Sequence, residues 1–76
     1  MKKRDFLELL KETMSRDENL EEEMLLESIE EYDSLAVLSL MAMYDELGVN
    51  VVPKDFENLK TVKDLIALAG GNVIDE

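Results

Sequence analysis

Apolar residues recur at helical spacing in short segments of this chain, which are separated by glycine, by proline and by a long acidic run. Two segments carry the clearest stripes. These are Phe6, Leu9, Leu10 and Met14 in the first, and Val37, Leu40, Tyr44 and Leu47 in the second. Because apolar positions three and four apart lie on one face of a helix, this spacing predicts amphipathic helices. With few β-branched residues and one proline, the chain is expected to be all-α.

We expect three longer helices and one short helix, packed as a small four-helix bundle with a long first loop. The predicted ranges are Lys2–Ser15, Ser34–Leu47, Lys54–Asn58 and a last helix from Thr61 to Gly70-Gly71. In the second helix, Leu38, Ala42 and Asp45 fall nearer the side of Ser34. Met41 and Met43 fall at the margins of the core stripe. Phe56 anchors the short helix. In the last helix, the inward residues are Val62, Leu65, Ile66 and Ala69.

Local signals mark the ends of these helices. Gly48 suits the left-handed conformation that often follows a helix. Pro53 pre-sets the backbone for the short helix. Thr61 and Asp64 approximate a capping box, with Asp in place of the preferred Glu.

The long first loop is strongly acidic. It carries nine acids and no Lys or Arg, namely Asp17, Glu18, Glu21, Glu22, Glu23, Glu27, Glu30, Glu31 and Asp33. Apolar residues alternate with these acids, so we expect the loop to be pinned to the core, with a helical turn near Leu20–Met24. A connection of this length in a small domain is often functional.

The size, composition and charge of the chain argue against several classes of protein. The chain has 76 residues, no Cys and a formal charge of −11. We therefore expect one domain, 1–76, with a loose tail over 72–76, and no disulfide or thiolate metal site. The negative charge argues against nucleic acid as a partner, because affinity for it comes largely from basic side chains that neutralise its phosphates. No apolar run is long enough to span a bilayer, and no signal region follows the basic start, so a cytoplasmic monomer is expected.

Asp33-Ser34-Leu35 is the candidate functional motif. Asp33 is a favourable N-cap, so Ser34 should stand exposed in the first turn of the second helix. Unpaired amides and the helix dipole make that end tolerant of phosphate. The triplet alone is more often an ordinary cap.

The chain lacks the usual means of catalysis. It contains no His and no Cys, and Ser34 has neither a base nor a glycine-rich elbow around it. The segment from Asp17 fails as a calcium loop because Glu22 and Ser28 occupy positions that need Gly and Glu. We expect no enzymatic activity and no metal site. Ser34 is better interpreted as a residue that another enzyme modifies.

From the first helix to Ala69, the chain resembles the acyl carrier proteins. The resemblance lies in its length and acidity, the long first loop, Asp33-Ser34-Leu35 before the second helix, Val52-Pro53 before a short helix, and Thr61-Val62 before the last. It implies that Ser34 receives 4′-phosphopantetheine from coenzyme A through a separate Mg²⁺-dependent transferase. The thiol of this group would then carry acyl intermediates as thioesters between enzymes of fatty acid synthesis or a related pathway.

The resemblance also implies further roles. Leu35, Leu38, Asp45 and Glu46 would contact partner enzymes with basic patches, and Asp33 and Leu35 would flank the modified serine. A cargo chain could enter between the helices, lined by Val37, Leu40, Leu65 and Ile66, which are core residues in any case.

The chain departs from the family at two places. The family often has a glycine two residues before the Asp. This chain has Glu31 at that position, followed by Tyr32. Ala36, Ser39 and Ala42 replace acids that many fatty acid carriers have on the second helix. A dedicated carrier for a polyketide, polysaccharide or aminoacyl pathway is therefore one alternative. Others are a non-covalent acidic helical module that binds a basic protein and, less favoured because of the surrounding acids, phosphorylation of Ser34.

The high net charge gives a first prediction. Repulsion among acids destabilises a compact chain, and salt screens it. Raising the ionic strength from low to physiological, or adding a divalent cation, should raise the melting temperature measured by circular dichroism. A melting temperature that does not change would contradict this interpretation.

Overall fold

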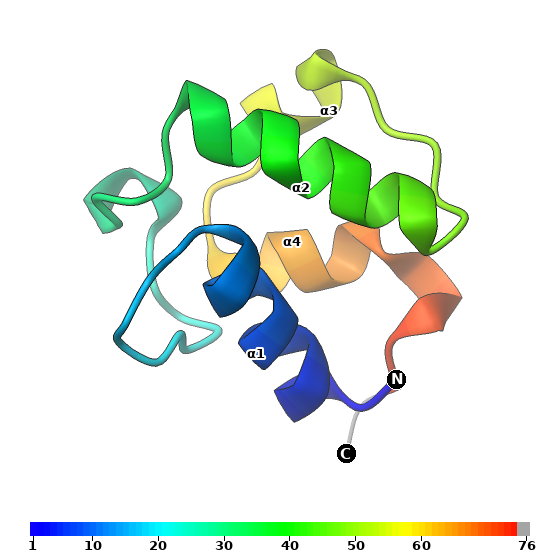
Figure 1. The fold of residues 1–76 in the computed structure, drawn as a ribbon, viewed down its shortest axis with the longest axis horizontal. Helices are drawn as coiled ribbons and strands as arrows, with labels where there is room; N and C mark the ends of the chain where they lie inside the picture. Colours follow the sequence, from blue (N-terminus) through cyan, green and yellow to red (C-terminus); the bar gives the residue numbers. More distant parts are fainter. Residues whose placement is uncertain (75–76) are drawn as a thin grey trace.

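The computed structural model describes residues 1–74, in which helices are joined by loops (Figure 1). The helices are α1 (Lys3–Thr13), α2 (Ser34–Glu46), α3 (Pro53–Glu57) and α4 (Val62–Leu68), with short 3-10 helices η1 (Leu26–Ser28) and η2 (Gly70–Asn72). Within this part of the chain, β pairing is limited to two isolated bridges. No helix in it is long and apolar enough to cross a bilayer. The prediction of a small all-α fold with three longer helices and one short helix is confirmed.

The helix ends differ from the predicted ranges by one or two residues. α1 is shorter at both ends than Lys2–Ser15, and α2 ends at Glu46 with Leu47 as its C-cap. α3 begins and ends one residue earlier than predicted, because Pro53 itself is the first helical residue. Before α4, the Asp64 carboxylate accepts hydrogen bonds from the amides of Lys60 and Thr61, at 2.9 and 3.1 Å.

Tyr44 is the centre of the core. Its ring is fully buried in α2 and contacts Phe6 of α1 and Phe56 of α3, with both ring centroids 6.1 Å away. Its hydroxyl donates a hydrogen bond of 2.5 Å to the carbonyl of Leu65 in α4. Tilted aromatic pairs at this distance add to the stabilisation that burial gives. One side chain therefore joins all four helices.

Most residues of the predicted core stripes are buried, whereas Leu9, Val37, Leu47 and Ile66 are only partly buried. Met43, expected at the margin of α2, is only 6% exposed, and Ala36 in the first turn of the helix is also buried. The Thr13 hydroxyl of α1 lies 3.6 Å from the Met43 sulfur. The long α1 packs over this side of α2, so the buried face of α2 is wider than a single stripe.

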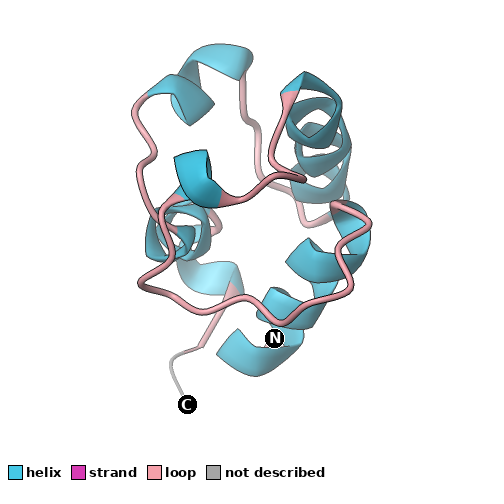
Figure 2. Cartoon of the chain, turned by 90° about the vertical axis from the view of Figure 1, so that its left-hand side faces the viewer, coloured by secondary structure: helices cyan, strands magenta, loops and turns pink. Residues whose placement is uncertain are grey.

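The acidic first loop is pinned to the core as expected. Leu20, Leu26 and Ile29 are buried, whereas Leu25 is exposed. Three backbone hydrogen bonds tie the loop to the start of α4, from Leu26 to Lys60, from Val62 to Met24 and from Lys63 to Glu22, at 2.8 to 3.0 Å. In Figure 2 the loop crosses beside α4 before it turns up to α2. A hydrogen-bonded turn lies near Leu20–Met24 as predicted, since the Met24 amide donates to the Glu21 carbonyl at 3.1 Å, and the 3-10 helix η1 that follows was not predicted.

The expectation of a loose tail over 72–76 is wrong for the described residues. Ile74 pairs with the start of the chain: its amide donates to Met1 and its carbonyl accepts from Lys3, at 2.8 and 3.1 Å. Figure 1 shows the last described residues beside the start of the chain. Asp75 and Glu76 lie outside the described residues.

α1 ends in a left-handed residue that is not glycine. Ser15 has φ 56°. Its amide donates to Glu12, and the amide of Arg16 donates to Lys11, at 3.1 and 2.9 Å. This is a Schellman motif, which α2 also forms but with Gly48 at the left-handed position.

The left-handed backbone of Ser15 should therefore lower the free energy of unfolding. A residue with a Cβ is strained in the left-handed region, and glycine is not. Ser15→Gly should raise the free energy of unfolding by roughly 0.5–1 kcal/mol after the greater freedom of unfolded glycine is counted. Urea denaturation measures this difference. Ser15→Ala, which keeps the Cβ, should bring no gain, and a less stable glycine variant would contradict the analysis.

Candidate functional site

Asp33 caps α2. Its backbone is extended (φ −130°, ψ −170°), and its Oδ1 accepts a hydrogen bond of 2.9 Å from the amide of Ala36. The Asp33 carbonyl accepts from the amide of Val37 at 3.0 Å, which starts the helical ladder. The predicted cap is confirmed, and Ser34 is the first helical residue.

Ser34 is exposed at this capped end. Within residues 1–74, neither its hydroxyl nor the amides of Ser34 and Leu35 have a hydrogen-bond partner. A helix of 13 residues leaves partial positive charge at this end. The site therefore offers an accessible hydroxyl oxygen beside two free amide donors, an arrangement that tolerates a phosphate group.

An open hollow of about 310 Å³ lies next to Ser34, between the end of α1 and the first turns of α2. Its lining mixes polar and apolar side chains: Thr13, Met14, Ser15, Glu31, Asp33, Leu35, Ala36 and Ser39. The left-handed turn at Ser15 forms one wall of this hollow.

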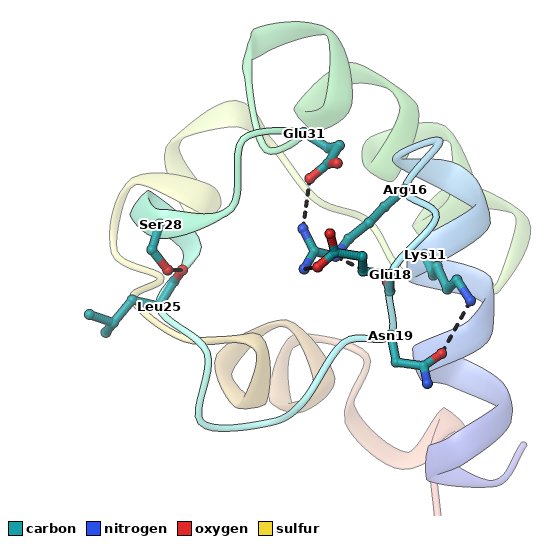
Figure 3. Close-up of polar contacts among 7 residues, drawn as sticks. All are labelled: Lys11, Arg16, Glu18, Asn19, Leu25, Ser28 and Glu31. Atoms are coloured by element: carbon teal, nitrogen blue, oxygen red, sulfur yellow. Dashed lines mark hydrogen bonds and ion pairs between the residues drawn. The ribbon is translucent and has the colours of Figure 1, made fainter.

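Arg16 ties the end of α1 to the residues that lead into α2. Its guanidinium makes an ion pair of 2.7 Å with Glu31 (Figure 3). It also reaches Glu18, whose backbone carbonyl accepts from Arg16 Nε at 3.1 Å. The Glu31 backbone amide and the Arg16 guanidinium both lower the pKa of the Glu31 carboxyl. Arg16 thus fixes the chain direction just before the candidate serine and neutralises one of the acids near it.

Tyr32 places an unsatisfied hydroxyl inside the protein. The residue is partly buried, and its hydroxyl oxygen is fully shielded from solvent with no hydrogen-bond partner in the structure. Burial raises the pKa of this hydroxyl. Burial, and secondarily the nearby Tyr32, also raise the pKa of Tyr44.

The residues assigned to partner contact are all exposed on α2. Leu35 and Leu38 are 73% and 60% exposed, and Asp45 and Glu46 lie farther along the helix. Of the candidate cargo-lining residues, Leu40 and Leu65 are fully buried, and Val37 and Ile66 are partly buried. These positions are compatible with both roles, which stay predictions.

Two features of the site were not predicted from the sequence, namely the ion pair of Arg16 and the buried hydroxyl of Tyr32. Arg16 is the last basic residue before Lys54, and its isolation at the edge of nine acids is a signal that it pairs with one of them. Tyr32, an aromatic residue within an acidic loop, is a weaker signal. Nothing in the sequence indicates that its hydroxyl would be buried without a partner.

Comparison of the chain with protein-family models, with curated proteins and with solved structures found no match in any of the three. Among residues 1–74, no three acidic side chains gather closely enough to hold a metal ion.

The cap at Asp33 can be tested directly. Asp33→Ala should lower the free energy of unfolding by about 1 kcal/mol, because the Ala36 amide loses its acceptor. Asp33→Asn keeps a side-chain oxygen and should recover most of the loss. Thermal or urea denaturation of both variants measures this. Equal destabilisation by Ala and Asn would show that the cap is not what Asp33 contributes.

Proposed function

We propose that this protein is an acyl-carrier-protein-like domain that is modified on Ser34 with 4′-phosphopantetheine and carries acyl groups in the cytoplasm. The observation that supports this most is the free, exposed Ser34 hydroxyl at the capped start of α2. The order of a long acidic loop, Asp33-Ser34-Leu35, a short helix after Pro53 and a last helix after Thr61 adds to it.

The residues present fit such a group. A phosphodiester on Ser34 would lie beside the free amides of Ser34 and Leu35, at the positive end of the helix dipole. It would carry one negative charge, which these donors can offset. The ion pair of Arg16 with Glu31 reduces the repulsion from neighbouring acids. Once attached, the group supplies a thiol that the chain, which has no Cys, does not contain.

The attachment step needs a separate enzyme. The Ser34 oxygen would attack the phosphorus next to pantetheine in coenzyme A. The new oxygen–phosphorus bond forms as the diphosphate linkage breaks, and adenosine 3′,5′-bisphosphate leaves. The serine proton would pass to a base on the transferase. A flexible arm on a rigid helix end then raises the effective concentration of its cargo at partner active sites.

The exposed side of α2 suits a partner with apolar and cationic contacts. Leu35 and Leu38 are apolar and exposed, and Asp45 and Glu46 add charge at the far end of the helix. Ser39 and Ala42, also exposed, leave the middle uncharged. This sparse charge favours a dedicated polyketide, polysaccharide or aminoacyl pathway over the fatty acid carriers, which have several acids here.

Intact-mass spectrometry tests the modification. The apo-protein is incubated with coenzyme A, Mg²⁺ and a broad-specificity phosphopantetheinyl transferase. We expect complete conversion to a species heavier by one phosphopantetheine. Ser34→Ala should abolish the adduct, whereas Ser39→Ala, an exposed serine of the same helix, should leave it intact.

Two outcomes would reject the proposal. One is the absence of an adduct on folded protein, and the other is an adduct that persists in Ser34→Ala. An acidic module that binds a basic partner without a covalent group would then be the better explanation. For such a module, Ser34→Ala should leave cellular function intact.

A further inference from the structure

Arg16 is an isolated cation that the fold holds in one place. It is the only basic residue between Lys11 and Lys54, and its side chain is 11% exposed. Its backbone is fixed by the turn that ends α1, where the Arg16 amide donates to the Lys11 carbonyl at 2.9 Å. An arginine with an anchored backbone and a shielded side chain loses little further freedom when it forms an ion pair. Such a pair contributes more than the ion pair of two exposed side chains.

The Arg16 guanidinium joins the beginning of the acidic loop to its end (Figure 3). At the beginning, Nε donates to the Glu18 carbonyl at 3.1 Å, and Nη2 lies 3.6 Å from the Glu18 carboxylate. At the end, Nη1 lies 2.7 Å from Oε1 of Glu31, which is a short charge-assisted hydrogen bond. A planar guanidinium presents its donors in fixed directions, so these contacts set where Glu31 lies relative to α1.

The segment from Glu31 to Ser34 has few other restraints. The Tyr32 amide donates to the Ile29 carbonyl at 3.0 Å, and the Asp33 carboxylate caps α2. Within residues 1–74, the amides of Asp33 and Ser34 have no hydrogen-bond partner. Only Tyr32 and Asp33 separate Glu31 from the candidate serine. The ion pair of Arg16 therefore restrains the backbone that an enzyme must contact to reach Ser34.

We propose that Arg16 is a positioning residue, which holds Glu31 and thereby presents the Ser34 hydroxyl in the orientation that the modifying transferase binds. The inference rests on the proposed function and adds a recognition determinant that lies outside α2. Arg16 contacts no reacting atom. Without the ion pair, the segment would adopt several orientations, and the transferase would bind only the competent fraction. Its apparent affinity for the carrier would fall by that fraction, whereas the rate in the bound complex would not change.

Steady-state kinetics of the transferase test this role. Modification of the apo-protein by coenzyme A, Mg²⁺ and the transferase is followed by intact mass at several carrier concentrations. Arg16→Gln and Glu31→Gln should each raise the KM for the carrier by roughly 3- to 10-fold with kcat unchanged, as expected when one more side chain must be ordered on binding. In the double variant the KM should rise no further, because the same contact is already lost.

Three controls separate this role from charge and from stability. Lys11→Gln removes a cation of α1 that has no contact with Glu31, and it should leave the KM unchanged. The two single variants change the net charge in opposite directions, so a purely electrostatic effect on a basic transferase would move their KM values in opposite directions. Hydrogen exchange should become faster at the Tyr32 amide in both variants and stay unchanged at the Leu40 amide of α2, which reports global opening.

Several outcomes would overturn the inference while leaving the carrier function intact. These are an unchanged KM in Glu31→Gln, increases that add in the double variant, opposite changes in the two single variants, or an equal increase in Lys11→Gln. If Arg16→Gln does not fold, Glu31→Gln decides the question, because it breaks the same contact and leaves Arg16 bound to Glu18. Absence of an adduct on wild type would reject the proposed function itself.

Discussion

The fold depends on the contacts of Tyr44. Its ring lies between Phe6 and Phe56, and its hydroxyl bonds to the Leu65 carbonyl, so one side chain of α2 joins α1, α3 and α4. A domain of 76 residues buries little apolar surface per residue and has no disulfide to supplement it. A central aromatic residue suits such a small domain. Its ring packs against two helices, and the hydrogen bond of its hydroxyl fixes their orientation relative to a third.

This arrangement explains why the other end of α2 can carry the candidate site. The core contacts of Tyr44 and Met43 fix the second half of the helix, so its first turn does not have to be buried. That turn is instead held by the Asp33 cap and by the ion pair of Arg16 with Glu31. The result is a rigid helix whose first residue, Ser34, projects into solvent. A tether attached there would move freely while its anchor stayed in place.

Features that depend on interactions between neighbouring residues could be predicted from the sequence. Features that depend on contacts between distant segments could not. The cap at Asp33, the left-handed Gly48 and the carboxylate of Asp64 are local, and their residue types indicated them. The position of η1, the burial of Met43 and the pairing of Ile74 depend on segments far apart in the sequence, and each of these was misplaced or missed. The same division applies to the site. Ser34 was found from its neighbours, but the Arg16–Glu31 pair and the buried Tyr32 hydroxyl arise only when the loop folds over the core.

Two residues have an unfavourable local arrangement, Ser15 in its backbone and Tyr32 in its hydroxyl, and both lie near the candidate serine. Ser15 adopts a left-handed conformation where Gly48 and Gly70 serve elsewhere, and it lines the hollow next to Asp33 and Leu35. Tyr32 buries a hydroxyl without a partner two residues before Ser34. Natural chains tend to be locally consistent, and their exceptions concentrate where function imposes a different requirement. A fold selected for stability alone would have glycine at the first position and phenylalanine at the second. Both exceptions lie near Ser34, and this supports the proposal that this end of the helix is the functional one.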